Sequence, residues 1–257
     1  MDLDYIEFWA TTHCNLHCRG CSSCSPIAET CFLSESQLAF DLQRLKSLGI
    51  NIRNINILGG EPLLHPNICD LFRCVKNIYP DCGLGILTNG FLLPQMDHFF
   101  WECCKQLNVK INVTCFPVMS AEIRDAIIQK ISSFKLAYHV TEKKRFNKIL
   151  TLNNNSSIAE IQKQCGCKNA YNLNNGYVSR CTVPMVVGNL NRKFGCDFIE
   201  TGKLNIHTST GEEILKFLET PNDSCRNCSA HPIKVSWATT ACPQLSDWVI
   251  GENEHEI

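Results

Sequence analysis

The sequence has no apolar run long enough to cross a membrane, because no stretch reaches the roughly 18 consecutive apolar residues that a span requires. An excess of one charge sign is also missing, since 24 Lys and Arg stand against 25 Asp and Glu. This balance argues against a strongly basic nucleic-acid surface. The first residues are acidic and no long apolar run follows them. We therefore expect no secretory signal, no membrane partner and no nucleic-acid partner.

Cysteine, in contrast, is abundant: the 257-residue chain contains 18. In a short secreted protein this number would indicate a disulfide scaffold. Here apolar residues make up 44% of a chain that is long enough to bury a core without covalent staples. We therefore predict a cytoplasmic protein whose thiols stay reduced, some of them holding metal. Four cysteines in helical patterns are expected to be small buried hydrophobic residues instead: Cys69, Cys74, Cys103 and Cys104.

The first 150 residues alternate strand-like and helix-like segments joined by short connections. The predicted strands cover residues 6–11, 52–58, 84–87, 109–116 and 136–140, and the predicted helices about 38–48, 68–79, 94–107 and 121–131. This order predicts parallel βα units with right-handed crossovers, in an open or partly closed α/β barrel or a doubly wound sheet. Functional residues should then lie at the carboxyl ends of the strands.

The sequence changes character near residue 150. A polar, turn-rich stretch over 143–157 indicates a boundary. Beyond it we predict a hairpin over 171–179, a short helix over 211–218, and otherwise loops with scattered cysteines. A region with so little apolar periodicity would gain stability from a metal cluster at its core. We therefore divide the chain into two regions, 1–150 and 151–257.

Three cysteines follow the first predicted strand with the spacing C-x3-C-x2-C: Cys14, Cys18 and Cys21. Three thiolates from one loop can hold three irons of a [4Fe–4S] cluster and leave the fourth iron open to a small molecule. A closed zinc site would need a fourth ligand, for which Cys24, His13 and His17 are candidates. The spacing alone therefore fits either an open iron–sulfur cluster or a zinc site.

Two further motifs lie where the next strands end. Gly59-Gly60-Glu61-Pro62 follows the second predicted strand, and Thr88-Asn89-Gly90 follows the third. Together with the three-cysteine loop and the βα repeat, the first of these motifs resembles the radical S-adenosylmethionine (SAM) superfamily over residues 5–140. The resemblance implies an α/β fold with a partial (β/α)6-type radical SAM barrel. It also implies reductive cleavage of SAM to a 5′-deoxyadenosyl radical, which abstracts a hydrogen from the substrate.

The resemblance implies roles for the residues of these motifs. Cys14, Cys18 and Cys21 would bind the [4Fe–4S] cluster, and the methionyl part of SAM would chelate its open iron. The Gly59-Gly60-Glu61-Pro62 motif would bind the SAM amino group, because glycines allow the backbone to come close. The electron for SAM cleavage would come from a flavodoxin- or ferredoxin-type reductant.

Two further positions bear on the SAM site. Asn89 stands where the family often contacts the SAM ribose or carboxylate, although a turn accounts for Thr88-Asn89-Gly90 equally well. The family usually has an aromatic or large apolar residue just before the third cysteine, next to the adenine, and this chain has Gly20 there. Another residue must then complete the adenine pocket.

A second set of cysteines lies in the C-terminal region. Cys225 and Cys228 form a C-x2-C pair, and Cys165 and Cys181 flank the predicted hairpin with its glycine at 176. This layout resembles the twitch and SPASM extensions of radical SAM enzymes. Because the further cysteines of a SPASM domain are missing after the pair, the shorter twitch type is indicated. The implied ligands of one auxiliary [4Fe–4S] cluster are Cys165, Cys181, Cys225 and Cys228.

Alternatives remain at this second set. Cys167 competes with Cys165, which we favour because the spacing from Cys167 to the hairpin glycine is short for the motif. A zinc ribbon on the same four residues is the other interpretation.

Four cysteine ligands would leave no iron of the auxiliary cluster open, and such a cluster suits electron transfer. We therefore expect a radical SAM oxidoreductase that dehydrogenates a sugar- or cyclitol-type small molecule. The layout resembles that of 2-deoxy-scyllo-inosamine dehydrogenase, a small twitch enzyme. The alternatives are a radical epimerase with Cys115 as hydrogen donor, a peptide-modifying enzyme that forms a thioether or carbon–carbon crosslink, and a zinc-stabilised binding module.

Overall fold

A computed structural model describes residues 1–153, 156–251 and 254 of the chain. The chain divides into two compact units. Unit 1 comprises residues 1–14 and 30–144, and unit 2 comprises 15–29 together with the chain from 145 onward. The functional division at residue 150 stays a prediction.

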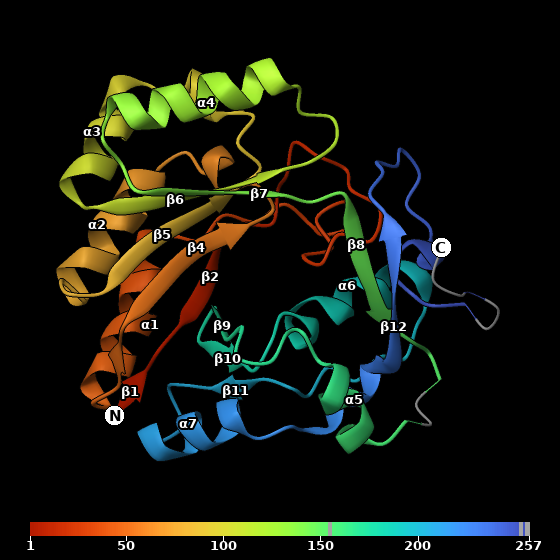
Figure 1. Cartoon of the computed structure of the whole chain (residues 1–257). Helices are drawn as coiled ribbons and strands as arrows, with labels where there is room; N and C mark the ends of the chain where they lie inside the picture. Colours follow the sequence, from red (N-terminus) through yellow and green to blue (C-terminus); the bar gives the residue numbers. More distant parts are fainter. Residues whose placement is uncertain (154–155, 252–253, 255–257) are drawn as a thin grey trace. The chain divides into compact units, whose positions relative to one another are not determined.

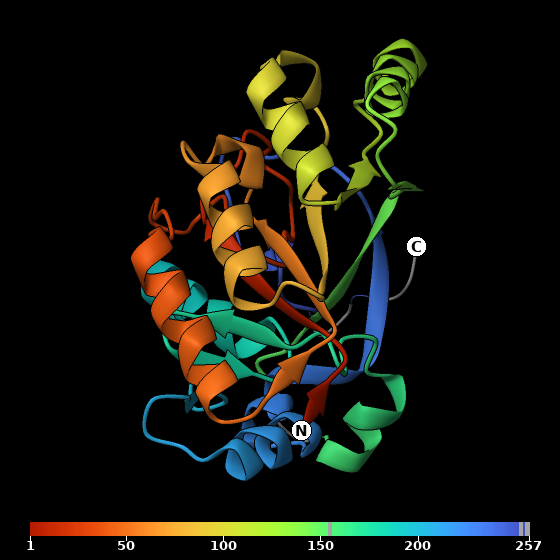
Figure 2. The ribbon, with the colours of Figure 1, turned by 90° about the vertical axis from the view of Figure 1, so that its left-hand side faces the viewer.

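A parallel sheet forms the centre of unit 1. Its strands run in the order β2 (Ile6–Thr11), β4 (Asn54–Gly59), β5 (Gly83–Thr88), β6 (Val109–Cys115) and β7 (Tyr138–Glu142). The short strands β1 (Asp2–Leu3) and β3 (Asn51–Ile52) pair beside it. One face of the sheet is covered by α1 (Glu35–Ser47), α2 (Ile68–Ile78), α3 (His98–Gln106) and α4 (Ala121–Ser133), as Figures 1 and 2 show. The predicted βα repeat is confirmed.

The helices of unit 1 form where the apolar period and the capping residues agree. In α1 the Ser34 hydroxyl accepts a hydrogen bond from the Gln37 N–H, and Leu38, Leu42 and Leu45 are buried. The predicted helix over 94–107 is interrupted, because the Asp97 side chain caps α3 and leaves a separate 3-10 turn over Leu93–Gln95. The four cysteines predicted as core residues, Cys69, Cys74, Cys103 and Cys104, are all buried.

Unit 2 is built from short elements. The predicted hairpin is formed by β9 (Asn172–Asn174) and β10 (Tyr177–Ser179), and its turn residues Asn175 and Gly176 have φ values of 46° and 79°. Positive φ at both positions is typical of a two-residue type I′ turn. The strand β11 (Leu204–Asn205) extends this hairpin, and β8 (Arg145–Leu150) pairs antiparallel with β12 (Cys228–Ser236). The predicted short helix is α7 (Gly211–Glu219).

Unit 2 contains more regular structure than predicted. The segment expected to be loop includes α5 (Ile158–Gln164) and the 12-residue α6 (Val183–Phe194). Pro184 in the first turn of α6 and Gly195 at its C-cap, with φ of 67°, are ordinary start and stop signals. Strand β8 falls within the polar stretch expected to be a boundary. Short 3-10 turns cover Asp223–Asn227 and Leu245–Asp247.

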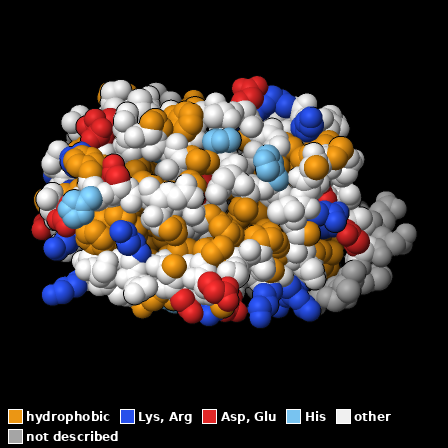
Figure 3. Space-filling model, turned by 90° about the horizontal axis from the view of Figure 1, so that it is seen from above, with side chains coloured by type: hydrophobic (Ala, Val, Ile, Leu, Met, Phe, Trp, Pro, Cys, Tyr) orange, Lys and Arg blue, Asp and Glu red, His pale blue; other side chains and the backbone are white. Residues whose placement is uncertain are grey.

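Two surface properties bear on the expected partners. Among the described residues, no helix has both the length and the apolar character needed to cross a bilayer. On the face drawn in Figure 3, Lys and Arg side chains lie at several separate places among hydrophobic and polar ones.

Candidate functional site

The glycines at the end of β4 lie directly against the chain that leaves β2. The Gly60 N–H donates to the Thr11 carbonyl at 2.7 Å, and the Glu61 N–H donates to the His13 carbonyl at 2.8 Å. A Cβ atom added to Gly59 would lie 2.1 Å from the Thr11 oxygen, and one added to Gly60 would lie 2.1 Å from the His13 oxygen. The two positions therefore require glycine, and they fix the backbone immediately before Cys14.

The Glu61 carboxylate is fully buried and joins the ends of β4 and β5. Its Oε1 accepts hydrogen bonds from the Thr88 hydroxyl at 2.7 Å and the Leu63 N–H at 3.1 Å, and its Oε2 accepts one from the Asn89 N–H at 2.8 Å. Burial raises the pKa of Glu61 to about 7, against the effect of these donors. The side chain thus has a structural role. We predict that the motif contacts SAM through backbone groups.

Asn89 contributes both to a turn and to the surroundings of Cys14. Its Oδ1 accepts a hydrogen bond from the Phe91 N–H at 3.1 Å, so the predicted turn is present. Its Nδ2 lies 4.0 Å from the Sγ of Cys14. An amide donor facing a thiolate fits a metal-ligating cysteine, while contact of Asn89 with SAM stays a prediction.

Cys18 and Cys21 lie on the segment 15–29, which packs against C-terminal residues of unit 2. The indole N–H of Trp237 donates to the Cys18 Sγ at 3.2 Å, and the indole N–H of Trp248 donates to the Cys21 carbonyl at 2.8 Å. Burial raises the pKa of the Cys18 thiol to about 11, while the Trp237 donor favours the thiolate. A bound metal ion would favour the thiolate further.

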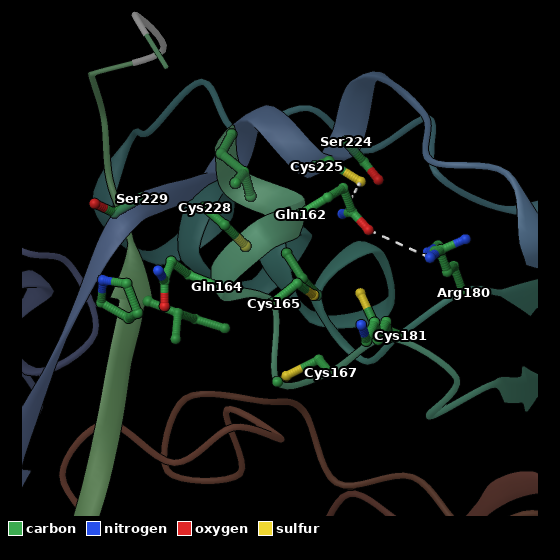
Figure 4. A pocket seen from close by; sticks show the side chains of 16 residues that line it. Gln162, Gln164, Cys165, Cys167, Arg180, Cys181, Ser224, Cys225, Cys228 and Ser229 are labelled. Carbon is green, nitrogen blue, oxygen red and sulfur yellow. Dashed lines mark hydrogen bonds between the residues drawn. The ribbon is translucent and has the colours of Figure 1, made fainter. Parts of the chain in front are cut away.

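Five cysteines of unit 2 line a single cavity, shown in Figure 4: Cys165, Cys167, Cys181, Cys225 and Cys228. Cys165 and Cys167 follow α5, and Cys181 follows β10. Cys225 lies in the turn over Asp223–Asn227, and Cys228 begins β12. Burial and the neighbouring thiols raise the pKa of Cys181 to about 12 and that of Cys228 well above its usual value. The structure thus gathers the four predicted ligands, and it places both Cys165 and Cys167 at the cavity.

The spacing of these thiols bears on the choice between zinc and iron–sulfur. Among the residues that the structure describes, no three Cys, His, Asp or Glu side chains converge as ligands of a single ion. A zinc site needs sulfurs at about 2.3 Å around one point, whereas a [4Fe–4S] cluster holds its ligands around a wider core. The choice between an auxiliary cluster and a zinc site at this cavity stays a prediction.

Comparison with known sequences gives a family match to the N-terminal part of the chain. Residues 6–124 match the family described as a 4Fe–4S single cluster domain. The GTP 3′,8-cyclase of Sulfurovum sp. (strain NBC37-1) is 26% identical over 174 residues, which cover 65% of this chain and 52% of the relative. That of Chlorobaculum tepidum is 35% identical over 91 residues, covering 35% of this chain and 27% of the relative. The chain thus spans about half or less of these relatives.

Among solved structures, a crystal structure of BtrN in complex with AdoMet and 2-DOIA resembles this chain with a TM-score of 0.54. The match covers 89% of this chain and 94% of that one. Because the two sequences are only 20% identical, the match shows similarity of fold alone. These comparisons support the radical SAM superfamily that the motifs predict. The predicted fold class is confirmed, and so are the predicted cofactors, SAM and a [4Fe–4S] cluster. Individual ligands stay predictions.

The structure explains why this chain has a glycine before the third loop cysteine. Gly20 has a φ of 63°, and a Cβ atom there would lie 2.6 Å from the backbone oxygen of Asp247. The Asp247 side chain also pairs with the neighbouring Arg19 at 2.6 Å. Backbone from the C-terminal part of unit 2 therefore occupies the space that a larger residue at position 20 would need.

Cys115, the predicted hydrogen donor of a radical SAM epimerase, lies at the end of β6 and is 7% exposed. It shares a face of the strand with Val113, which packs near Ile127 of α4 around Gly90. Burial raises the pKa of its thiol, and its charged neighbours are Arg124 of α4 and Glu142. Cys115 thus points to the side of the sheet that α4 covers, as expected for a buried strand residue.

Proposed function

We propose that this protein oxidises a hydroxyl-bearing small molecule of the sugar or cyclitol class by two electrons. When bound, SAM and its cluster would supply a 5′-deoxyadenosyl radical able to take a hydrogen atom from a C–H bond. The second electron would pass to an auxiliary cluster, and the hydroxyl proton would leave to water. The observation that carries the proposal is the cavity of unit 2 lined by five cysteines. That cavity offers ligands for all four irons of a closed cluster.

The residues of the two thiol sites would have separate tasks. Cys14, Cys18 and Cys21 would hold the SAM cluster, with N–H donors from Asn89 and Trp237 directed at two of the sulfurs. In unit 2, the half-buried Cys181 and Cys228 would be ligands of the auxiliary cluster and would limit the access of water to it. A closed, buried cluster cannot bind substrate at an iron, so electron acceptance is the role that remains for it.

Two observations favour oxidation over the alternatives. Cys115 lies on the side of β6 that faces α4, which weakens its case as a hydrogen donor in an epimerase. The cysteine spacing of unit 2 resembles that of 2-deoxy-scyllo-inosamine dehydrogenase, and the fold is similar to that of BtrN in its complex with AdoMet and 2-DOIA. Both support an alcohol-bearing ring as substrate.

Turnover by the reconstituted protein tests the proposal. The iron-loaded full chain would be incubated without oxygen with SAM, dithionite and a panel of sugars, aminocyclitols and cysteine-containing peptides. We expect a sugar or cyclitol product that has lost two hydrogens, with one 5′-deoxyadenosine formed per product. Cys181→Ala should still form 5′-deoxyadenosine but no oxidised product, whereas Cys196→Ala, outside the cavity, should behave as the unmodified chain.

Other products would contradict the proposal. A product of unchanged mass that gains one deuterium from heavy water would indicate epimerisation, and a crosslinked peptide would indicate peptide modification. Normal oxidation by Cys181→Ala would show that the auxiliary cluster is not the electron acceptor.

A further inference from the structure

A buried cation lies beside the five-cysteine cavity. Arg180 follows β10, immediately precedes Cys181, lines the cavity and is 9% exposed. Its Nη1 donates to the backbone carbonyls of Leu218 and Glu219, and its Nη2 donates to the Oε1 of Gln162 at 3.3 Å. Its Nε–H is buried and has no hydrogen-bond partner among the described residues.

The charge of Arg180 is not neutralised by the groups it contacts. Its partners are two carbonyl oxygens and an amide oxygen, and no carboxylate pairs with it in the described part of the chain. A buried charge is unfavourable unless an opposite charge lies nearby. Four thiolates around an iron–sulfur core carry net negative charge, so a cluster in this cavity would be the missing counter-ion.

Gln162 connects this cation to one of the thiols, as Figure 4 shows. Because a guanidinium group has donors and no acceptor, Arg180 must face the amide oxygen of Gln162. The amide nitrogen is thereby turned toward the cavity, where it donates to the Cys225 Sγ at 3.5 Å. Arg180 thus sets the orientation of Gln162. Gln162 lies on α5, and Arg180 directly follows strand β10 of the hairpin.

We propose that Arg180 and Gln162 form a relay of N–H donors that raises the reduction potential of the auxiliary cluster and so makes it an electron acceptor. This inference rests on the proposed function. Uptake of one electron makes the cluster more negative, so a nearby positive charge and an N–H donor to a ligand sulfur stabilise the reduced form. Both residues are positioning residues, and they act on the potential of the cluster.

The test measures the potential of the auxiliary cluster alone. In the full chain, Cys14, Cys18 and Cys21 are replaced by alanine, and the remaining cluster is titrated with dithionite while the reduced signal is followed by electron paramagnetic resonance. Gln162→Leu is compared with Gln164→Leu, because Gln164 lies on the same helix and lines the same cavity. Gln164 makes no hydrogen bond to a thiol among the described residues.

We expect Gln162→Leu to lower the equilibrium constant for one-electron reduction about tenfold, which is about 59 mV. Gln164→Leu should change it less than threefold. Arg180→Gln should lower it at least as far as Gln162→Leu, and Arg180→Lys, which keeps the charge, should lower it less. Since Arg180 also bonds the end of α7, an Arg180 variant that does not fold leaves Gln162→Leu as the deciding variant.

Two results would contradict different claims. The relay would be contradicted if both glutamine variants changed the reduction constant equally, or if Gln162→Leu at full iron content did not change it. Either result would leave the proposal of an auxiliary cluster intact. Absence of iron from the triple-alanine chain would instead overturn the auxiliary cluster of the proposed function.

Discussion

Cysteine has different surroundings in the two units of this molecule. In unit 1, Cys69, Cys74, Cys103 and Cys104 pack as small apolar side chains within a core of helices and strands. In unit 2, five cysteines face one cavity and each lies near other thiols. Unit 1 draws its stability from extended apolar faces, while unit 2 has short elements with less apolar periodicity. The comparison shows that the surroundings of a cysteine, more than its number in the sequence, indicate its role.

The sharpest test of this comparison is removal of iron, which should affect unit 2 far more than unit 1. The reconstituted chain is expected to hold about eight irons and the Cys228→Ala variant about four. Amide hydrogen exchange should then speed up in α5 and β12, whose ends contribute cavity cysteines, while β4 and β5 keep their protection. Equal loss of protection in both units would show that unit 2 does not depend on its thiol site.

A pH experiment addresses a buried charge in unit 1. Burial raises the pKa of Glu61 to about 7 from an ordinary value of 4.5, so the folded chain binds more protons between these values than the unfolded chain. Stability should therefore fall as the pH rises through this window, by on the order of 3 kcal/mol for this group. Denaturant unfolding of the iron-free chain at pH 5 and pH 8 measures the difference.

Glu61→Gln should remove most of this pH dependence, because the amide does not ionise. Glu122→Gln, at an exposed glutamate in the first turn of α4, should leave it unchanged. If Glu61→Gln keeps the full dependence, other groups cause it.

A smaller effect is expected from the indole donor at the SAM cluster. Trp237→Phe removes the N–H that faces the Cys18 sulfur, so the reduction constant of that cluster should fall about tenfold. Trp248→Phe removes a donor to a backbone carbonyl and should shift the potential less. Redox titration followed by electron paramagnetic resonance compares the two, and a larger shift in Trp248→Phe would contradict the assignment.

The smallest effect is expected at a core cysteine of unit 1. Cys104 is fully buried, and Cys104→Ala removes one small group from the core, at a cost of about 1 kcal/mol in the free energy of unfolding. Iron content and SAM cleavage should not change. Loss of iron in this variant would contradict the distinction between core cysteines of unit 1 and cavity cysteines of unit 2.

The sequence predicts those segments of the fold whose own residues show an apolar period or a capping residue. The strands and helices of unit 1 follow from their apolar periods and from caps such as Ser34. Helix α6 was not predicted although Pro184 and Gly195 mark its ends, because half of its residues are Val, Gly or Asn, which are weak helix formers. The four ligands predicted for the auxiliary cluster follow from motif spacing, and the structure brings them to one cavity.

The contacts around the thiols were not predictable from the sequence. Trp237 lies 219 residues from Cys18, and Gln162 lies 63 residues from Cys225. No local period or motif links either pair, since such contacts arise from tertiary packing. The structural role of the Glu61 side chain was missed for the same reason, because its partners come from the next strand.

The packing of residues 15–29 against the C-terminal part of unit 2 has a consequence for the order of events during synthesis. The loop cysteines leave the ribosome well before the tryptophans and Asp247 that contact this segment, since Trp237 follows Cys18 by 219 residues and Trp248 follows Cys21 by 227. The indole donor to Cys18 is therefore absent until Trp237 has been made. Correct packing of this loop, and with it stable loading of iron at Cys18 and Cys21, thus has to wait for synthesis of the C-terminal part of unit 2.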